Sequence, residues 1–175
     1  TTAAFIEKND TAFLAAAGQR NRLYLVPTTS ADTPYTLSLG EYSNKPASKH
    51  SHIKTLDSPD NNPTYIAAGD DSGNITIVDI AACSEHGEDS NRMDCSNVVT
   101  WQGHEGQPVR SVAFSEDGCY LASAADDVKV KLWPVLSNEE GFHTNQEDYT
   151  VRKSRRMRSR NPLKLRPLET DEVSQ

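Results

Sequence analysis

The sequence predicts an all-β chain of about three units, each of four antiparallel strands, followed by a polar and basic tail. Short apolar stretches alternate with polar residues, and turns rich in Gly, Asn and Asp separate them. The same pattern recurs along the chain, which indicates a repeat architecture. We expect the units near residues 1–39, 53–80 and 98–136 within a repeat segment 1–140, and a flexible tail at 141–175.

The first unit is predicted from two strands at 14–18 and 22–27, preceded by Phe5-Ile6. The earlier strand consists of small residues, and a polar turn at 19–21 separates it from the later one. In the later strand Leu23 and Leu25 are two residues apart and therefore fall on one face.

The second unit is predicted at 66–79, where the polar turn 70–74 separates two apolar strands. The small-residue strands of the three units begin at Leu14, Ile66 and Leu121, at intervals of 52 and 55 residues. In each unit the last strand ends at the same distance in sequence from the start of the small-residue strand.

The third unit carries the clearest pattern, with four predicted strands over 98–135. It resembles one repeat of the WD-repeat family: Gly103-His104 opens it, residues 112–118 form a strand and turn, and Leu132-Trp133 closes it. Pro134 stands where the family usually has Asp. The resemblance implies a β-propeller built of four-stranded blades, of which this chain would supply about three. A WD repeat takes about 40 to 45 residues, so we expect the extra residues to form surface loops at 40–52 and 82–96.

The resemblance also implies a buried hydrogen-bonded network of His104, Ser123, Asp127 and Trp133. An indole N–H in a packed sheet needs an acceptor, and these side chains can supply a satisfied chain. Because such residues would be buried, we do not expect a Ser-His-Asp hydrolase, and the chain has no G-x-S-x-G sequence. The first two units lack the equivalent residues, so we expect apolar packing alone to hold them. The residues at those positions are Ala16, Arg20 and Val26 in the first unit and Ala68, Ser72 and Val78 in the second.

Neither a metal nor a cofactor is expected. Three cysteines, an odd number, do not suggest a disulfide framework and fit a reducing compartment. Cys83, His86 and Cys95 could in principle bind zinc, but no fourth ligand is evident. His50 and His52 could bind a metal together, but they lie in a polar insertion. The turn 70–74 superficially resembles a calcium loop, but it lacks the terminal glutamate of such a loop.

Charge is distributed unevenly. The chain has 18 basic and 25 acidic residues, yet 152–166 contains eight basic residues and no acidic ones. The alternatives for this segment are a nucleic-acid contact, a targeting signal or a solvated tail. Leu163, Leu165 and Leu168 could mark one weak strand or a docking segment. We expect no membrane span, and because the chain starts at Thr1 we expect it to be a segment of a longer product.

The predicted function is a non-catalytic protein-interaction scaffold or sensor within a larger WD-repeat protein. We expect Gln107, Arg110 and Asp126, with Asp71 as their counterpart in the second unit, to face the protein partner. The missing blades would come from the parent chain or from another copy. The amino-acid sequence of residues 103–134 also resembles the C-terminal sensor propellers of bacterial STAND-class signalling NTPases, although no phosphate-binding loop occurs in this chain.

Two other functions are considered. One is a nucleic-acid-associated factor that binds through 152–166, and the other is a propeller-type hydrolase, for which no exposed nucleophile can be named. The expected location is cytoplasmic, with the nucleus as the alternative because of the basic tail.

Overall fold

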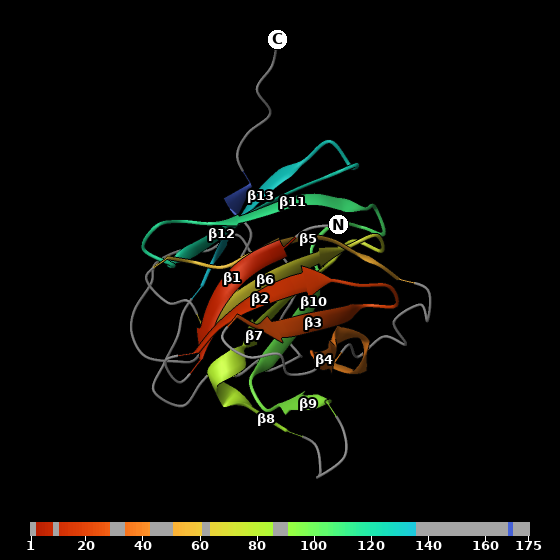
Figure 1. Ribbon diagram of the computed structural model, residues 1–175. Helices are drawn as coiled ribbons and strands as arrows, with labels where there is room; N and C mark the ends of the chain where they lie inside the picture. The colour runs from red at the N-terminus through yellow and green to blue at the C-terminus, as the bar shows by residue number, and fades with distance from the viewer. Residues whose placement is uncertain are drawn as a thin grey trace.

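The strands of the computed structural model pair with their neighbours along the chain (Figure 1). The structure describes residues 3–8, 11–28, 34–42, 51–60, 64–85, 91–135 and 168–169. These described residues form three four-stranded antiparallel sheets, which we call sheets 1, 2 and 3, and one two-stranded hairpin. The predicted all-β fold is confirmed.

Sheet 1 contains the strands predicted for the first unit. These are β1 (Ala3–Lys8), β2 (Thr11–Ala17), β3 (Arg22–Pro27) and β4 (Tyr35–Ser38), in that spatial order. Leu23 and Leu25 are buried and the residues beside them, Arg22 and Tyr24, are exposed. The alternation in the sequence thus marks a strand with one face in the core.

Sheet 2 contains three strands of the second unit and one strand that we had expected in the third. Its members are β5 (Ile53–Asp57), β6 (Tyr65–Asp70), β7 (Asn74–Asp79) and β10 (Val98–Gln102). The expectation that 98–136 forms one sheet is wrong for Val98–Gln102, which pairs antiparallel with β7. The chain returns to the outer edge of sheet 2 before residues 103–108 lead on to sheet 3.

Sheet 3 contains β11 (Val109–Phe114), β12 (Tyr120–Ala125), β13 (Val130–Pro134) and β14 (Leu168–Glu169). The sequence pattern was expected to end at Leu136, but β14 pairs with β13 and completes the sheet. A strand around Leu168 was one of the sequence-based interpretations. The basic segment 152–166 and the rest of the predicted tail lie outside the described residues.

The insertion between β7 and β10 is a hairpin rather than the loop expected for 82–96. It consists of the 3-10 helix η2 (Ile80–Ala82), β8 (Cys83–Glu85) and β9 (Met93–Cys95). Cys83 and Cys95 lie opposite each other and form a disulfide, so the expectation of unpaired cysteines is wrong for these two. Cys119 is free and exposed. In the other insertion, Leu39–Tyr42 forms the 3-10 helix η1, Ser51 is buried, and 43–50 lie outside the described residues.

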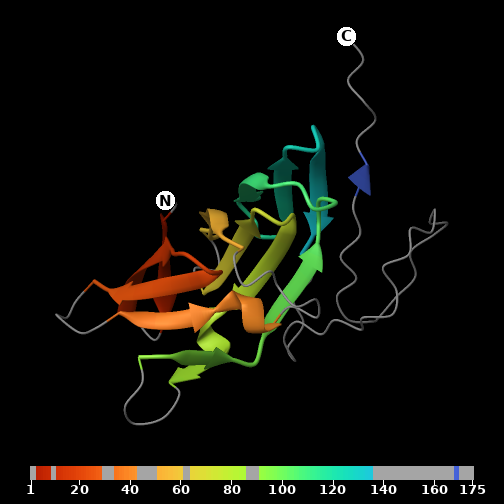
Figure 2. The same cartoon turned by 90° about the vertical axis from the view of Figure 1, so that its right-hand side faces the viewer.

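Sheet 2 lies between the other two sheets, and an apolar core fills each junction (Figure 2). The core between sheets 1 and 2 includes Ile6, Leu23, Leu25, Ile53, Ile66 and Val78. The core between sheets 2 and 3 includes Ala67, Ile77, Trp101, Val109, Leu121 and Trp133. Each sheet is therefore stabilised mainly by the neighbour it packs against. No described helix has the length and apolar character needed to cross a membrane.

Candidate functional site

The structure brings His104, Ser123, Asp127 and Trp133 together in one buried network. Trp133 Nε1 donates to Ser123 Oγ at 2.8 Å, and Ser123 Oγ lies 2.8 Å from His104 Nε2. The other ring nitrogen, Nδ1, lies 2.8 Å from Asp127 Oδ2. An indole nitrogen can only donate, so the Ser123 hydroxyl is free to donate to Nε2 and His104 then donates from Nδ1 to the carboxylate. In this assignment each of the three hydrogen bonds within the network has one donor and one acceptor.

The Asp127 carboxylate is held in its ionised form. Burial raises its pKa, but hydrogen bonds from His104 and from the Lys129 N–H outweigh that effect, so the pKa lies below its usual value. The carboxylate end of the network is consequently an acceptor at neutral pH.

This network does not present a nucleophile, although it contains a serine, a histidine and an aspartate. His104 is fully buried, Ser123 is buried, and the Ser123 oxygen already accepts the Trp133 N–H. A nucleophilic serine must reach its substrate, which this one cannot do without breaking the sheet. The geometry therefore gives the network a structural role.

The turn of sheet 2 holds the network in place from outside sheet 3. The backbone N–H groups of Gly103 and His104 both donate to the carbonyl of Gly73, each at 3.0 Å. Gly73 has φ of +84°, and a Cβ at this position would lie 1.7 Å from the His104 carbonyl oxygen. Only glycine allows the two backbones to approach this closely. The β6–β7 turn therefore determines where the His104 side chain meets Ser123 of sheet 3.

The β2–β3, β6–β7 and β12–β13 turns share one left-handed residue at the same offset from the small-residue strands. Asn21 has φ of 53°, Gly73 84° and Val128 60°. Asn and Gly tolerate this conformation, but a β-branched residue there is strained. The carbonyl of Asn21 accepts from the Leu39 N–H, much as that of Gly73 accepts from the next loop.

A second buried polar network, which the sequence did not reveal, is centred on Asp70. Its carboxylate accepts from Asn21 Nδ2 at 3.1 Å, Ser51 Oγ at 2.8 Å, and the backbone N–H groups of Ser72 and Asn74 at 2.9 Å. The expectation that apolar packing alone holds the first two units is therefore wrong. Asn21 and Ser51 reach Asp70 from distant parts of the chain, so no local signal could have shown the contact.

The predicted partner-facing residues lie at one end of sheets 2 and 3. Arg110 forms a bidentate ion pair with Asp126, at 2.8 Å from Nε and 2.5 Å from Nη2, and both residues are exposed. The hydrogen bond from Arg110 keeps the pKa of Asp126 below its usual value. Gln107 is exposed on the adjacent loop, and its carbonyl oxygen would lie 3.0 Å from a Cβ on Gly73. We call Gln107, Arg110, Asp126 and Asp71 the loop face.

Asp71 is already bonded to its own chain. It accepts from the Ser51 hydroxyl and the His52 N–H, both at 2.9 Å, and it lies 3.1 Å from His52 Nδ1. Burial raises its pKa, but these hydrogen bonds outweigh that effect and lower it. Asp71 thus fixes the loop before β5 and has less freedom to meet a partner than Arg110.

The cysteine and histidine clusters considered for metals do not form a site in the part of the chain that is described. Cys83 and Cys95 are joined in the disulfide, and no group of three or more His, Cys, Asp or Glu residues there could hold a metal ion. His50 and His86 lie outside the described residues. The turn 70–74 directs its backbone N–H groups at Asp70, as expected of a tight turn.

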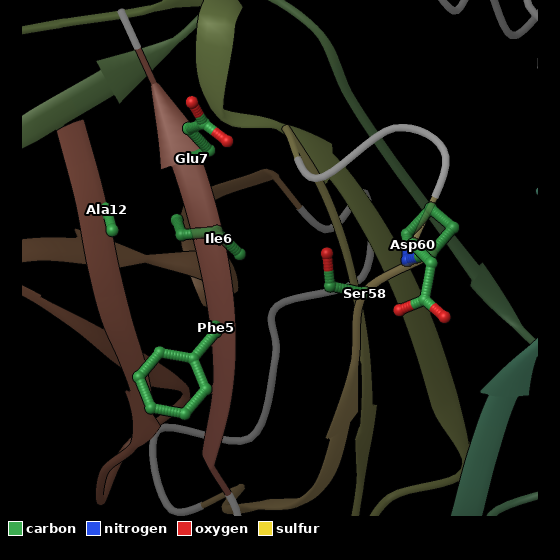
Figure 3. Close-up of a pocket in the computed structure, with 7 residues that line it drawn as sticks. Phe5, Ile6, Glu7, Ala12, Ser58 and Asp60 are labelled. Carbon is green, nitrogen blue, oxygen red and sulfur yellow. The ribbon is translucent and has the colours of Figure 1, made fainter. Parts of the chain in front are cut away.

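A pocket of about 260 Å³ opens between β1 and the segment that follows β5 (Figure 3). Phe5, Glu7 and Asp60 line it, together with Ser58, whose hydroxyl has no hydrogen-bond partner among the described residues. Phe5 is 72% exposed. The Ser58 hydroxyl forms no hydrogen bond to a base among the described residues, so the pocket gives no evidence of an activated nucleophile.

Comparison with known proteins finds a match to a repeat family over part of the chain. Residues 95–134 match the model of the WD domain, G-beta repeat. This match starts before β10 and ends with β13, so one repeat joins the outer strand of sheet 2 to three strands of sheet 3. That offset explains why the sequence pattern predicted Val98–Gln102 in the third unit. No curated protein sequence matches the chain.

Several solved structures share the fold. A chain of Chaetomium thermophilum polycomb repressive complex 2 has a TM-score of 0.58 and 24% identity over 80% of this chain and 26% of that chain. A chain of an active polycomb repressive complex 2 in the basal state has a TM-score of 0.59, with the same identity and coverage. The Cps50 (Swd1) β-propeller domain of Myceliophteria thermophila has a TM-score of 0.55 and 16% identity over 89% and 40% of the two chains.

These likenesses identify the architecture. Each of the three sheets corresponds to a blade of a partial WD β-propeller. This chain spans about a quarter of the length of the polycomb complex chains.

Proposed function

We propose that this chain is a non-catalytic protein-interaction module of a larger WD-repeat protein and that its partner docks on the loop face. The observation that carries the proposal is the position of Gln107, Arg110 and Asp126. They are exposed side chains with hydrogen-bonding groups. Gln107 lies on the loop before β11, Arg110 lies near the start of that strand, and Asp126 follows β12 directly. Binding residues occur preferentially on such loops.

The two buried networks support this proposal because they fix the loops from below. Asp127, next to Asp126, is bonded to His104, while Gly73 holds the loop that carries Gln107. A surface that is ordered before binding loses less conformational entropy when a partner docks. The loop face is therefore suited to recognition.

The solved relatives support a role within an assembly. Two of them are chains of polycomb repressive complex 2. The narrower interpretation, a sensor propeller attached to a signalling NTPase, depends on sequence resemblance alone and stays a prediction. Nucleic-acid binding through 152–166 also stays a prediction, because that segment lies outside the described residues.

We further propose that additional blades, from the parent chain or another copy, cover the outer faces of sheets 1 and 3. Phe5 on sheet 1 is 72% exposed, and Val130 on sheet 3 is 65% exposed. Apolar side chains on an open sheet face favour coverage by a neighbouring sheet.

The loop face can be tested by quantitative affinity purification of the chain from its own cells. Arg110→Glu reverses one charge of the ion pair and should abolish retention of the partner. Glu116→Arg provides the matched control, because Glu116 is exposed beyond the other end of β11. We expect this control to retain the same proteins as the unmodified chain.

A double variant separates binding from folding. Arg110→Asp combined with Asp126→Arg exchanges the charges and preserves the intramolecular ion pair. It should melt like the unmodified chain and still lose the partner. Retention of the same proteins by all of these variants would show that the loop face is not the docking surface.

A further inference from the structure

The hairpin between β7 and β10 belongs to sheet 2 by chain connection but packs against sheet 1. The Cys95 N–H donates to Tyr42 Oη at 2.8 Å, and Lys8 Nζ donates to the Cys83 carbonyl at 2.6 Å. The Thr36 N–H of β4 donates to the Asn91 carbonyl, and Thr36 forms a parallel bridge with Arg92. We call β8 with residues 91–95 the clasp hairpin, because it reaches from one sheet to the next.

The disulfide lies at the centre of these contacts. Cys83 and Cys95 are opposite each other in the β8–β9 ladder, and both are buried with Met93 in the core shared by sheets 1 and 2. Beside them a pocket of about 210 Å³ is lined by residues of both parts, including Lys8, Tyr35 and Glu85. The cross-link thus stabilises the part of the hairpin that touches sheet 1.

The other contacts of the clasp hairpin are individually weak. The Arg92–Glu41 ion pair is about half exposed on both sides, and exposed pairs contribute little. The backbone connection to β4 is a single bridge rather than a ladder, and the Tyr35 hydroxyl of β4 adds one exposed hydrogen bond to Glu85 at 2.9 Å. A two-stranded hairpin of this size is marginal without additional support. The cross-link, which spans 12 residues, supplies that support by limiting the unfolded conformations of the segment.

We propose that the Cys83–Cys95 disulfide makes the clasp hairpin a redox-sensitive connection between sheets 1 and 2. In the oxidised chain the hairpin covers the outer edge of β4. In the reduced chain the hairpin separates from that edge, which frees the Thr36 N–H and uncovers the residues around Met93.

The chemistry requires a dithiol reductant. One thiolate of the reductant attacks a sulfur of the disulfide, the S–S bond breaks, and a mixed disulfide forms with release of one cysteine thiolate. The second thiol of the reductant displaces the other cysteine. Overall the protein disulfide takes up two electrons and two protons to give two thiols, and the dithiol becomes a disulfide. Because both cysteines are buried, local opening of the hairpin precedes the attack.

Hydrogen exchange tests the proposal in the whole chain. Cys119→Ser removes the free thiol, and the protein is compared in its oxidised form and after treatment with dithiothreitol. We expect the Thr36 and Cys95 amides to exchange at least about tenfold faster after reduction. The Leu121 and Ser123 amides of sheet 3 should not change, and reoxidation should restore the original protection.

Three outcomes would contradict the proposal. One is equal protection of the Thr36 and Cys95 amides in the two forms. Another is loss of protection throughout sheet 3, which would make the disulfide a general stabilising cross-link. The third is detection of free thiols at Cys83 and Cys95 by alkylation of the folded, air-oxidised chain. A Cys83→Ser, Cys95→Ser variant should match the reduced form, and the comparison of the two redox forms remains valid if that variant does not fold.

Discussion

At the residue scale, the two tryptophans differ in their hydrogen bonding more than in their burial. Trp101 is 6% exposed and packs edge-on against Trp133, with ring centroids 5.4 Å apart. Its Nε1 has no hydrogen-bond partner among the described residues, whereas Trp133 Nε1 donates to Ser123. Alanine at either position would remove a core side chain at a cost of about 3–5 kcal/mol.

Phenylalanine substitutions separate the two roles. Trp133→Phe leaves the Ser123 hydroxyl without its donor and should lower the free energy of unfolding by about 1–3 kcal/mol. Trp101→Phe removes an unpaired N–H and should cost less. Urea unfolding of both variants measures the difference, and an equal loss would contradict the assigned network.

The lowered pKa of Asp127 predicts that the free energy of unfolding depends on pH. Its pKa in the folded chain lies below the unfolded value of about 3.9, so the folded state is favoured while the carboxylate is ionised. This contribution is present above that value and is lost as the pH falls through the folded pKa. Asp127→Asn should therefore be less stable at pH 7 and should flatten the stability profile below about pH 4. Unfolding curves between about pH 2 and pH 7 test this, and an unchanged profile would contradict it.

Val128 occupies an unfavourable backbone conformation, and its side chain is exposed. It has φ of 60° and is 96% exposed, while the equivalent positions hold Asn21 and Gly73. Val128→Asn should stabilise the chain by about 1 kcal/mol, because Asn tolerates the left-handed region. Val130→Asn is the control, since Val130 lies in a strand and is also exposed. Thermal melts that show no gain at position 128 would contradict the strain.

Local patterns revealed one network and concealed the other. His104, Ser123, Asp127 and Trp133 could be located from the sequence because they lie within one repeat. Asp70 could not, because its partners Asn21 and Ser51 precede it by 49 and 19 residues and contact it only after folding.

At the scale of elements, the β6–β7 turn controls the position of the next sheet. Gly73→Ala would place a Cβ 1.7 Å from the His104 carbonyl oxygen and should cost at least about 2 kcal/mol. Gly106→Ala is the matched control, because Gly106 also has positive φ but a Cβ there meets nothing within 4 Å. We expect about 1 kcal/mol for this control. Denaturant midpoints compare them, and equal losses would show that the close approach has no energetic weight.

Strands were easier to predict than their partners. The alternation of residues located β2, β3, β6 and β7, and it also located β10. The pattern could not show that β10 pairs with β7, since pairing is decided by the connection between strands. The hairpin escaped prediction because its polar residues resemble a loop, while the cysteines that stabilise it were interpreted as unpaired.

At the scale of the whole molecule, the open faces of sheets 1 and 3 predict association. Phe5 and Val130 remain exposed on these faces, and isolated blades of a propeller expose apolar surface to water. The purified 175-residue chain should therefore self-associate or unfold with low cooperativity. Light scattering combined with thermal melting tests this. A monodisperse monomer with one cooperative transition would contradict the prediction.

The left-handed residue shared by the three turns gives the row of sheets a direction of assembly along the chain. The Asn21 carbonyl receives the Leu39 N–H, and the Gly73 carbonyl receives those of Gly103 and His104, so each acceptor precedes its donor along the chain. During synthesis from the N-terminus, every new segment meets an acceptor that has already been made. The Val128 residue occupies the equivalent position in the β12–β13 turn, so its carbonyl would be the corresponding acceptor if a further sheet packed on sheet 3.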